Sequence, residues 1–158
     1  MSKLQEEIPD VPSILAGVLR GIEPALQPVL LAKLERLAAE RYKRWANDPP
    51  DEAIKKGLLE CADREETIAE RIESLIPNAS EIQNNLLAEN PSLLELNRTL
   101  FEGRPLHIQF AMQAAGESAG AAAWQAYAAA TTDPDAQRII GSCSALEQAN
   151  ADFLQTLL

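Results

Sequence analysis

The sequence predicts an all-helical protein whose core is a bundle of four long helices. A chain of 158 residues is long enough for one domain with a sizeable core. Apolar residues make up 46% of it but aromatic residues only 4%, and alanine and leucine dominate, a composition typical of helical proteins. Four long segments with helical periodicity are separated by residues that start or stop helices.

Each long helix has recognisable boundaries. We expect the helices from about Pro28 to Asn47, from Asp51 to Pro77, from Pro105 to about Thr131, and from Asp133 to the C-terminus. Asp51 and Asp133 are favourable N-cap residues, and Pro105 and Pro134 suit a first helical turn. The first helix is stopped by the sequence NDPP.

The connections between the helices predict how they are paired. About 28 residues separate the second helix from the third, whereas the other two connections contain only a few residues each. Two antiparallel hairpins joined by a long crossover have this arrangement. Capping-box patterns at Ser80 with Gln83 and at Ser92 with Glu95 predict two short helices inside the crossover. Residues 11–22 predict one more short amphipathic helix outside the bundle.

We expect a single domain over residues 1–158, with the core bundle at about 28–158 and an N-terminal extension at 1–27.

Composition and charge restrict the classes of partner. The net charge of −10 argues against nucleic acid or an anionic membrane as partner, since both attract basic surfaces. No apolar run approaches the length of a membrane span, and the acidic N-terminus does not resemble a signal peptide. Two cysteines without secretory context favour a cytoplasmic location, and a homodimer or another protein partner stays open.

Each of the four helices carries one glutamate on its otherwise apolar or weakly polar inward face. Spacings of three and four residues place them on the faces that pack together in a bundle. These glutamates are Glu35, Glu65, Glu117 and Glu147. Four ionised carboxylates at one level of a bundle repel each other, and burying even one unpaired charge costs several kcal/mol. A bound cation, protonation or neighbouring basic residues could compensate, and the inward faces offer no lysine or arginine.

The two halves of the chain match at an offset of 82 residues. Glu35 matches Glu117, and Glu65 matches Glu147. Among the other matches are Tyr42 with Trp124, Trp45 with Tyr127, Asp51 with Asp133, and Cys61 with Cys143. An internal duplication of a helical hairpin is the economical explanation. Because helices two and four are then antiparallel, we expect the two cysteines as buried, reduced thiols on opposite sides of the glutamates.

Four segments of the sequence resemble the rubrerythrin branch of the ferritin-like superfamily. They read ERLAAERYKRWA, ADREETIAERI, GESAGAAAWQAYA and SALEQANADFL. The resemblance covers residues 28–158 and implies a ferritin-like fold with a di-iron carboxylate centre. By position the ligands would be the four glutamates, while Ile68 and Asn150 occupy the places of the family's two histidines.

Two interpretations follow from this histidine-free arrangement. In the first, the glutamates form a carboxylate-only metal site, with Asn150 as a weak extra ligand. Oxygen ligands suit Fe, Mn, Mg or Ca better than Zn or Cu, and Fe or Mn follows from the resemblance. The protein would then have a metal-binding or oxidoreductase-type role. In the second, the glutamates are a relic core that is partly protonated or hydrogen-bonded, and the bundle is a non-catalytic module for assembly or protein interaction.

Overall fold

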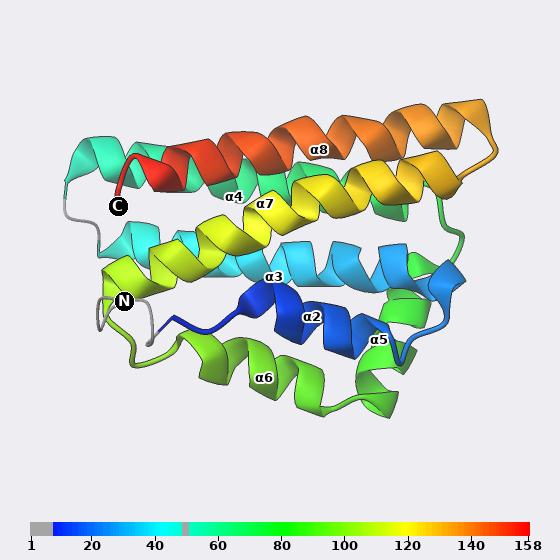
Figure 1. The fold of residues 1–158 in the computed structure, drawn as a ribbon, viewed down its shortest axis with the longest axis horizontal. Helices are drawn as coiled ribbons and strands as arrows, with labels where there is room; N and C mark the ends of the chain where they lie inside the picture. Colours follow the sequence, from blue (N-terminus) through cyan, green and yellow to red (C-terminus); the bar gives the residue numbers. More distant parts are fainter. Residues whose placement is uncertain (1–7, 49–50) are drawn as a thin grey trace.

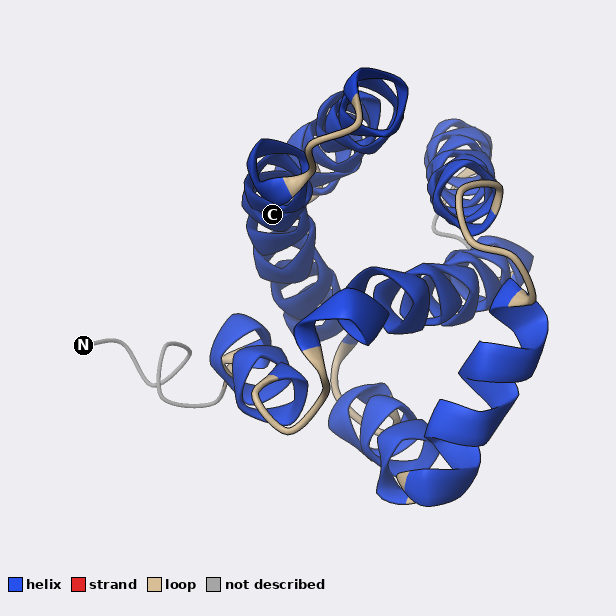
Figure 2. Ribbon diagram, turned by 90° about the vertical axis from the view of Figure 1, so that its right-hand side faces the viewer, coloured by secondary structure: helices blue, strands red, loops and turns tan. Residues whose placement is uncertain are grey.

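A computed structural model of the chain describes residues 8–48 and 51–158 (Figure 1). All regular structure in these residues is helical, and no strand occurs among them (Figure 2). The predicted all-helical class is therefore confirmed. Within the same residues, none of the helices is both long enough and apolar enough to cross a membrane.

The four long helices lie within a few residues of their predicted positions. They are α3 (Gln27–Asn47), α4 (Glu52–Glu73), α7 (Leu106–Ala130) and α8 (Pro134–Gln155). Asp51 caps α4 by accepting a hydrogen bond of 2.8 Å from the backbone N–H of Ile54. Asp133 caps α8 in the same way, with a bond of 3.1 Å from Ala136. These two predicted caps therefore act as expected, because a side-chain oxygen satisfies a backbone N–H that the helix itself leaves without a partner.

The connection between α4 and α7 contains the two short helices that the sequence predicts, but not their predicted caps. The helices are α5 (Ala79–Glu89) and α6 (Ser92–Phe101), and their N-cap residues are Asn78 and Pro91. Asn78 has a left-handed backbone, with φ of 60°, so that α5 begins before Ser80. The amide of Gln83 is directed elsewhere and donates a hydrogen bond of 3.0 Å to the carbonyl of Val29. The prediction that Ser80 and Gln83 cap α5 was therefore wrong, because the side chain of Gln83 connects α5 to α3 instead.

The helices pack as two pairs joined side by side. α3 packs along α4, α7 packs along α8, and α4 also contacts α8. α5 and α6 lie on the side of α3 that faces away from α8 (Figures 1 and 2). The predicted N-terminal helix is present as α2 (Val11–Leu19), followed by a 3-10 turn at Pro24–Leu26, and it packs against α7. It ends three residues before the expected position.

Two clusters of buried apolar residues fill the space among the four long helices. The first cluster includes Tyr42, Trp45, Leu58, Cys61, Phe110 and Leu154. The second includes Ile68, Ile72, Trp124, Ile140 and Cys143. Along α4 the two clusters are separated by Glu65, which follows Cys61 by one turn and precedes Ile68 by three residues. The apolar core is thus interrupted at the level of this buried acid.

Candidate metal centre

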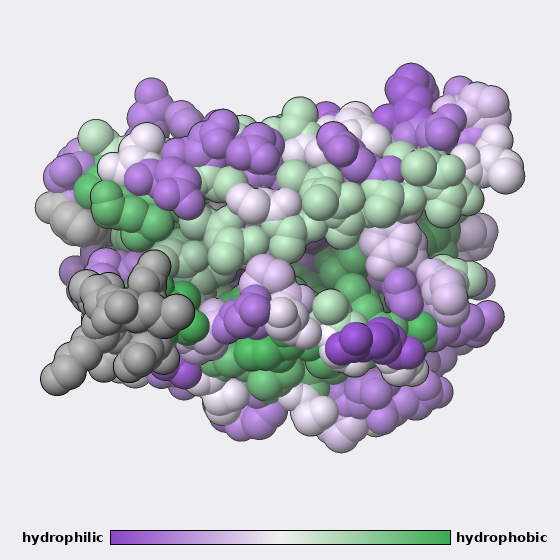
Figure 3. Space-filling model, viewed as in Figure 1, coloured by the Kyte–Doolittle hydropathy of each residue, from purple (hydrophilic) through white to green (hydrophobic). Residues whose placement is uncertain are grey.

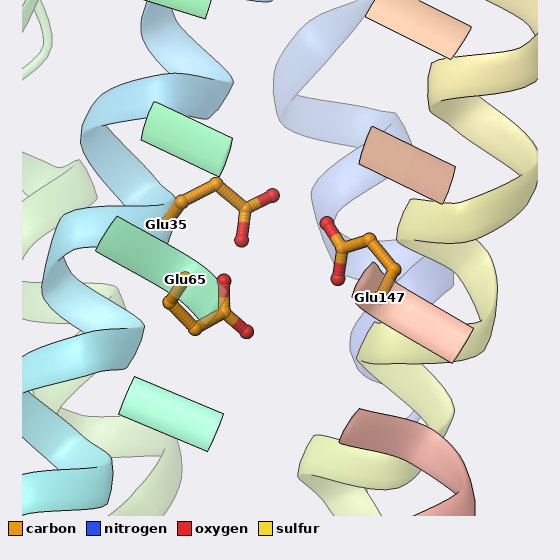
Figure 4. Close-up of side chains that lie close together, drawn as sticks. All are labelled: Glu35, Glu65 and Glu147. Carbon is orange, nitrogen blue, oxygen red and sulfur yellow. The ribbon is translucent and has the colours of Figure 1, made fainter. Parts of the chain in front are cut away.

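Three of the four predicted glutamates come together between the helix pairs. Glu35 on α3, Glu65 on α4 and Glu147 on α8 each offer a carboxylate oxygen, and the three oxygens lie within 4.8 Å of one another. Their side chains point toward a common centre (Figure 4). Glu65 is fully buried, Glu147 is 2% exposed, and Glu35 is half-buried. Three separate helices therefore place acidic groups at one point in the core.

The fourth glutamate, Glu117 on α7, is buried beside Glu65 and Glu147 and raises the pKa values of both, although it is not one of the three whose oxygens lie within 4.8 Å of one another. Its Oε1 accepts hydrogen bonds from the hydroxyl of Tyr42 at 2.6 Å and from the amide of Gln113 at 2.9 Å. Gln113 in turn accepts a bond of 2.6 Å from the guanidinium of Arg41, which lies 3.7 Å above the ring of Phe101. Glu117 therefore belongs to a buried polar network that extends from α7 to α3.

The carboxylates of Glu147 and Glu65 each accept a hydrogen bond from one side chain. The indole N–H of Trp124 donates to Oε1 of Glu147 at 2.9 Å. The amide nitrogen of Asn150 donates to Oε1 of Glu65 at 3.2 Å, while its oxygen accepts a bond from Arg64. Asn150 was expected as a weak extra ligand, but in this arrangement it orients Glu65 and its own oxygen is engaged.

The remaining oxygens of two glutamates have no partner. Oε2 of Glu65 and Oε2 of Glu117 are buried without a hydrogen bond. A buried polar atom in this condition costs about 1–3 kcal/mol, and more when the group is charged. Such atoms are rare in folded proteins, and an ion or a ligand is a common explanation.

Burial and mutual repulsion raise the pKa values of the three converging glutamates. Burial raises the pKa of Glu65 well above its usual 4.5, and the negative charge of Glu117 raises it further. Burial also raises the pKa of Glu147, with a further contribution from repulsion by Glu35. The pKa of Glu35 is raised by burial as well. The cluster is thus costly to ionise in the absence of a compensating cation.

The donor set fits a hard divalent cation. All three converging side chains offer carboxylate oxygen, the ligand type that Mg²⁺, Ca²⁺ and Mn²⁺ prefer. The positions of the two expected histidines hold no nitrogen ligand, since Ile68 is fully buried in the second apolar cluster and Asn150 is engaged as described. The ion pairs in the described part of the chain lie at other carboxylates, such as Glu73 with Arg36 and Glu66 with Lys43.

Two contributors to the site were not identified from the sequence. Arg41 follows Ala38 by three residues and precedes Trp45 by four, so that helical spacing already puts it on the inward face of α3. Trp124 was taken as a packing residue, although buried indoles usually find an acceptor for their N–H. The arrangement can bind a cation or retain protons.

Comparisons with protein-family models, curated proteins and solved structures find no match for this chain.

Proposed function

We propose that this protein is a divergent ferritin-like four-helix bundle that binds a hard divalent cation through Glu35, Glu65 and Glu147. The resemblance of the four long segments to the rubrerythrin branch supports the fold. The two helix pairs with their long connection also support it, since ferritin-like bundles are built from two such hairpins.

The observation that carries the proposal is the convergence of three carboxylates from three helices, one of which, Glu65, has a buried oxygen without a hydrogen-bond partner. A cation bound there would supply the missing partner for Oε2 of Glu65. It would also offset the repulsion that, in addition to burial, raises the pKa values of Glu65 and Glu147. Protonation is the alternative compensation, because a protonated carboxyl group can donate a hydrogen bond to a neighbouring carboxylate oxygen, and retention of metal distinguishes the two.

Fe(II) and Mn(II) are the ions that we expect to bind best. Mn(II) suits carboxylate ligands, and iron is the metal that the resemblance to di-iron carboxylate proteins implies. Such an ion, when bound, supplies positive charge and, for iron or manganese, a redox-active centre. Asn150 would hold Glu65 in place for it, and Trp124 would hold Glu147.

Equilibrium dialysis of chelator-treated protein against Mn(II), and against Fe(II) without oxygen, tests this directly. We expect one or more ions to be retained per chain and the thermal midpoint to rise with metal concentration. Glu65→Gln should abolish retention, because a neutral amide replaces the central carboxylate. Glu70→Gln is the matched control, since Glu70 is exposed on the same helix.

An absence of retained metal in the wild-type protein would contradict the proposal and favour the second interpretation, a non-catalytic bundle for assembly. Equal retention by the Glu65→Gln and Glu70→Gln variants would likewise place any bound metal elsewhere on the acidic surface. Circular dichroism of both variants confirms that they are folded before binding is compared.

A further inference from the structure

A pocket with a volume of about 260 Å³ lies among α2, α3, α6 and α7. Six of the leucines that line it remain only half-buried. They are Leu15 and Leu19 of α2, Leu31 and Leu34 of α3, and Leu96 and Leu100 of α6. Apolar surface is visible along the boundary between α2 and α7 (Figure 3). We refer to this space as the leucine pocket.

The half-buried leucines indicate that the pocket suits an apolar occupant. Elsewhere in the protein, leucines such as Leu30 and Leu58 are fully buried. Removal of apolar surface from water is the main favourable contribution to binding, as it is to folding. An apolar molecule in the leucine pocket would therefore cover leucine surface that the chain itself leaves uncovered.

The hydrogen-bond donors of the lining are already engaged within the protein. Arg41 donates a bond of 2.6 Å to Gln113, and its guanidinium lies 3.7 Å above the ring of Phe101. The amide of Gln113 and the indole N–H of Trp124 both donate to buried carboxylates. An anionic ligand would therefore have to give up its hydration for donors that have other partners, which costs free energy.

The acids of the lining do not select a cationic ligand either. Glu117 is 1% exposed and Glu147 is 2% exposed, so that their carboxyl groups have almost no surface open to the pocket. Glu35 is half-buried, and either a bound cation or a bound proton compensates its charge. The pocket therefore presents apolar surface to a ligand in both states of the carboxylate cluster.

Volume and length give the same size for the ligand. An apolar cavity of about 150 Å³ binds one benzene molecule, and at the same volume per carbon about 260 Å³ holds about ten carbons. Val11 and Leu19, which both line the pocket, lie about 12 Å apart along α2. An extended backbone advances about 3.8 Å for every three bonds, so that a chain of about ten carbons spans about 12 Å.

We infer that the leucine pocket binds an uncharged aliphatic molecule of about ten carbons, extended along α2 between Val11 and Leu19. The inference goes beyond the proposed function and does not require a bound metal. Glu65, the central residue of the proposed metal centre, does not line the pocket. The two sites can therefore be tested by different substitutions.

Calorimetric titration of metal-free protein with 1-hexanol, 1-octanol, 1-decanol and 1-dodecanol tests the size of the ligand. We expect the affinity to rise about fourfold with each added methylene group and to level off near 1-decanol, where the pocket is full. A rise that continues unchanged to 1-dodecanol would indicate partitioning onto apolar surface and would overturn the inference. Absence of binding by 1-decanol would overturn it as well.

Decanoate and decylamine, which are both charged at pH 7, test the charge of the ligand. We expect each to bind at least about tenfold more weakly than 1-decanol, because a charged group loses hydration in the pocket without gaining a partner. Tighter binding of either compound than of 1-decanol would overturn the inference of an uncharged ligand.

Two variants of α7 test the location. Ala119→Leu places a larger side chain in the pocket and should weaken 1-decanol at least about tenfold, whereas Ala122→Leu, at an exposed position outside the lining, should not. Thermal unfolding of both variants shows that they are folded before binding is compared. Equal affinity of 1-decanol for the two variants would overturn the inference.

NMR spectra of the wild-type protein test the location without a substitution. The chain has two tryptophans, and of these Trp124 lines the pocket whereas Trp45 does not. 1-Decanol should therefore shift the indole N–H signal of Trp124 more than that of Trp45, and an unchanged Trp124 signal on saturation would overturn the inference. Glu65→Gln should bind 1-decanol as the wild type does. Absence of retained Mn(II) would contradict the proposed function and leave this result unaffected, so that the two proposals can fail separately.

Discussion

The indole N–H of Trp45, near the end of α3, donates a hydrogen bond of 3.0 Å to the side-chain oxygen of Gln109, near the start of α7. At the opposite ends of the same helices, the hydroxyl of Tyr127 donates a bond of 2.8 Å to the side-chain oxygen of Gln27. Both the donors and the acceptors are related by the offset of 82 residues. A duplicated hairpin with approximate two-fold symmetry would produce this reciprocal pair of contacts.

The two bonds should stabilise the protein independently. We expect Tyr127→Phe to lower the free energy of unfolding by about 0.5–1.5 kcal/mol. Gln109→Leu should lower it by more, because the amide of Gln109 also donates a hydrogen bond of 2.8 Å to the carbonyl of Arg104. Because the sites lie at opposite ends of α3 and α7, the effects should add in the double variant. Urea denaturation measures all three values. A strongly non-additive double variant would show that the two ends are coupled.

The sequence predicted the helices and their inward faces well, because caps and spacing are local properties. Asp51 and Asp133 show this for the helix starts. The start of α5 was missed because the left-handed Asn78 carries no strong sequence signal. Helical spacing predicted that the four glutamates face inward, but it could not predict the hydrogen-bond partners of each carboxylate. Spacing puts Glu117 on the inward face, but contacts with Tyr42 and Gln113 decide where its carboxylate lies.

The stability of the metal-free protein should fall as the pH rises above 4.5. Because burial raises the pKa values of Glu65 and Glu147 in the folded protein, these groups keep their protons to a higher pH there than in the unfolded chain, where the usual pKa is 4.5. Their contribution to stability is therefore complete below that pH and is lost as the pH rises through the raised pKa values of the folded state. The difference in unfolding free energy between wild type and Glu65→Gln, measured from pH 4 to pH 8, isolates this effect.

We expect Glu65→Gln to become more stable relative to wild type as the pH rises, because the amide has no proton to lose. Glu70→Gln, at an exposed position, should show no comparable trend. Mn(II) should stabilise the wild type more at pH 8 than at pH 5, since a metal binds the deprotonated carboxylates. A pH-independent difference between wild type and Glu65→Gln would show that this carboxyl group is not protonated in the folded state.

Two glycines of α7 provide a matched comparison of packing at the site. A Cβ atom added at Gly120 would lie 2.8 Å from the carboxylate of Glu147, whereas one added at Gly116 would meet its nearest atom, on Val11, at 3.9 Å. Replacement of glycine by alanine inside a helix gains about 0.8–1 kcal/mol when nothing obstructs it. Gly116→Ala should therefore raise the stability of the protein.

Gly120→Ala should gain less stability than Gly116→Ala, or lose stability, because the carboxylate of Glu147, which accepts a hydrogen bond from Trp124, must shift to make room for the added Cβ atom. It should also weaken Mn(II) binding, which Gly116→Ala should leave intact. Urea denaturation and metal titration of the two variants give both comparisons. Equal behaviour in both measurements would mean that Glu147 moves without cost and that its position does not matter for the site.

The cysteines lie on opposite sides of the buried carboxylates. Each precedes a buried glutamate by four residues, Cys61 before Glu65 on α4 and Cys143 before Glu147 on α8. The two helices run in opposite directions (Figure 1). Cys61 accordingly packs in the first apolar cluster and Cys143 in the second. Both are free and buried, as expected from the sequence.

Both thiols should be unreactive in the folded protein and reactive after unfolding. Burial raises the pKa of Cys61 to about 12 and that of Cys143 to about 11, so that almost no thiolate is present at neutral pH. Only the thiolate is a nucleophile, and the surrounding core also excludes reagent. A disulfide-exchange reagent at pH 7.5 should therefore detect no thiol quickly in the native state and two per chain in guanidinium chloride without reductant. Fewer than two in the denatured, unreduced protein would reveal a disulfide. A disulfide requires Cα atoms within about 7 Å, whereas Cys61 and Cys143 pack in separate apolar clusters.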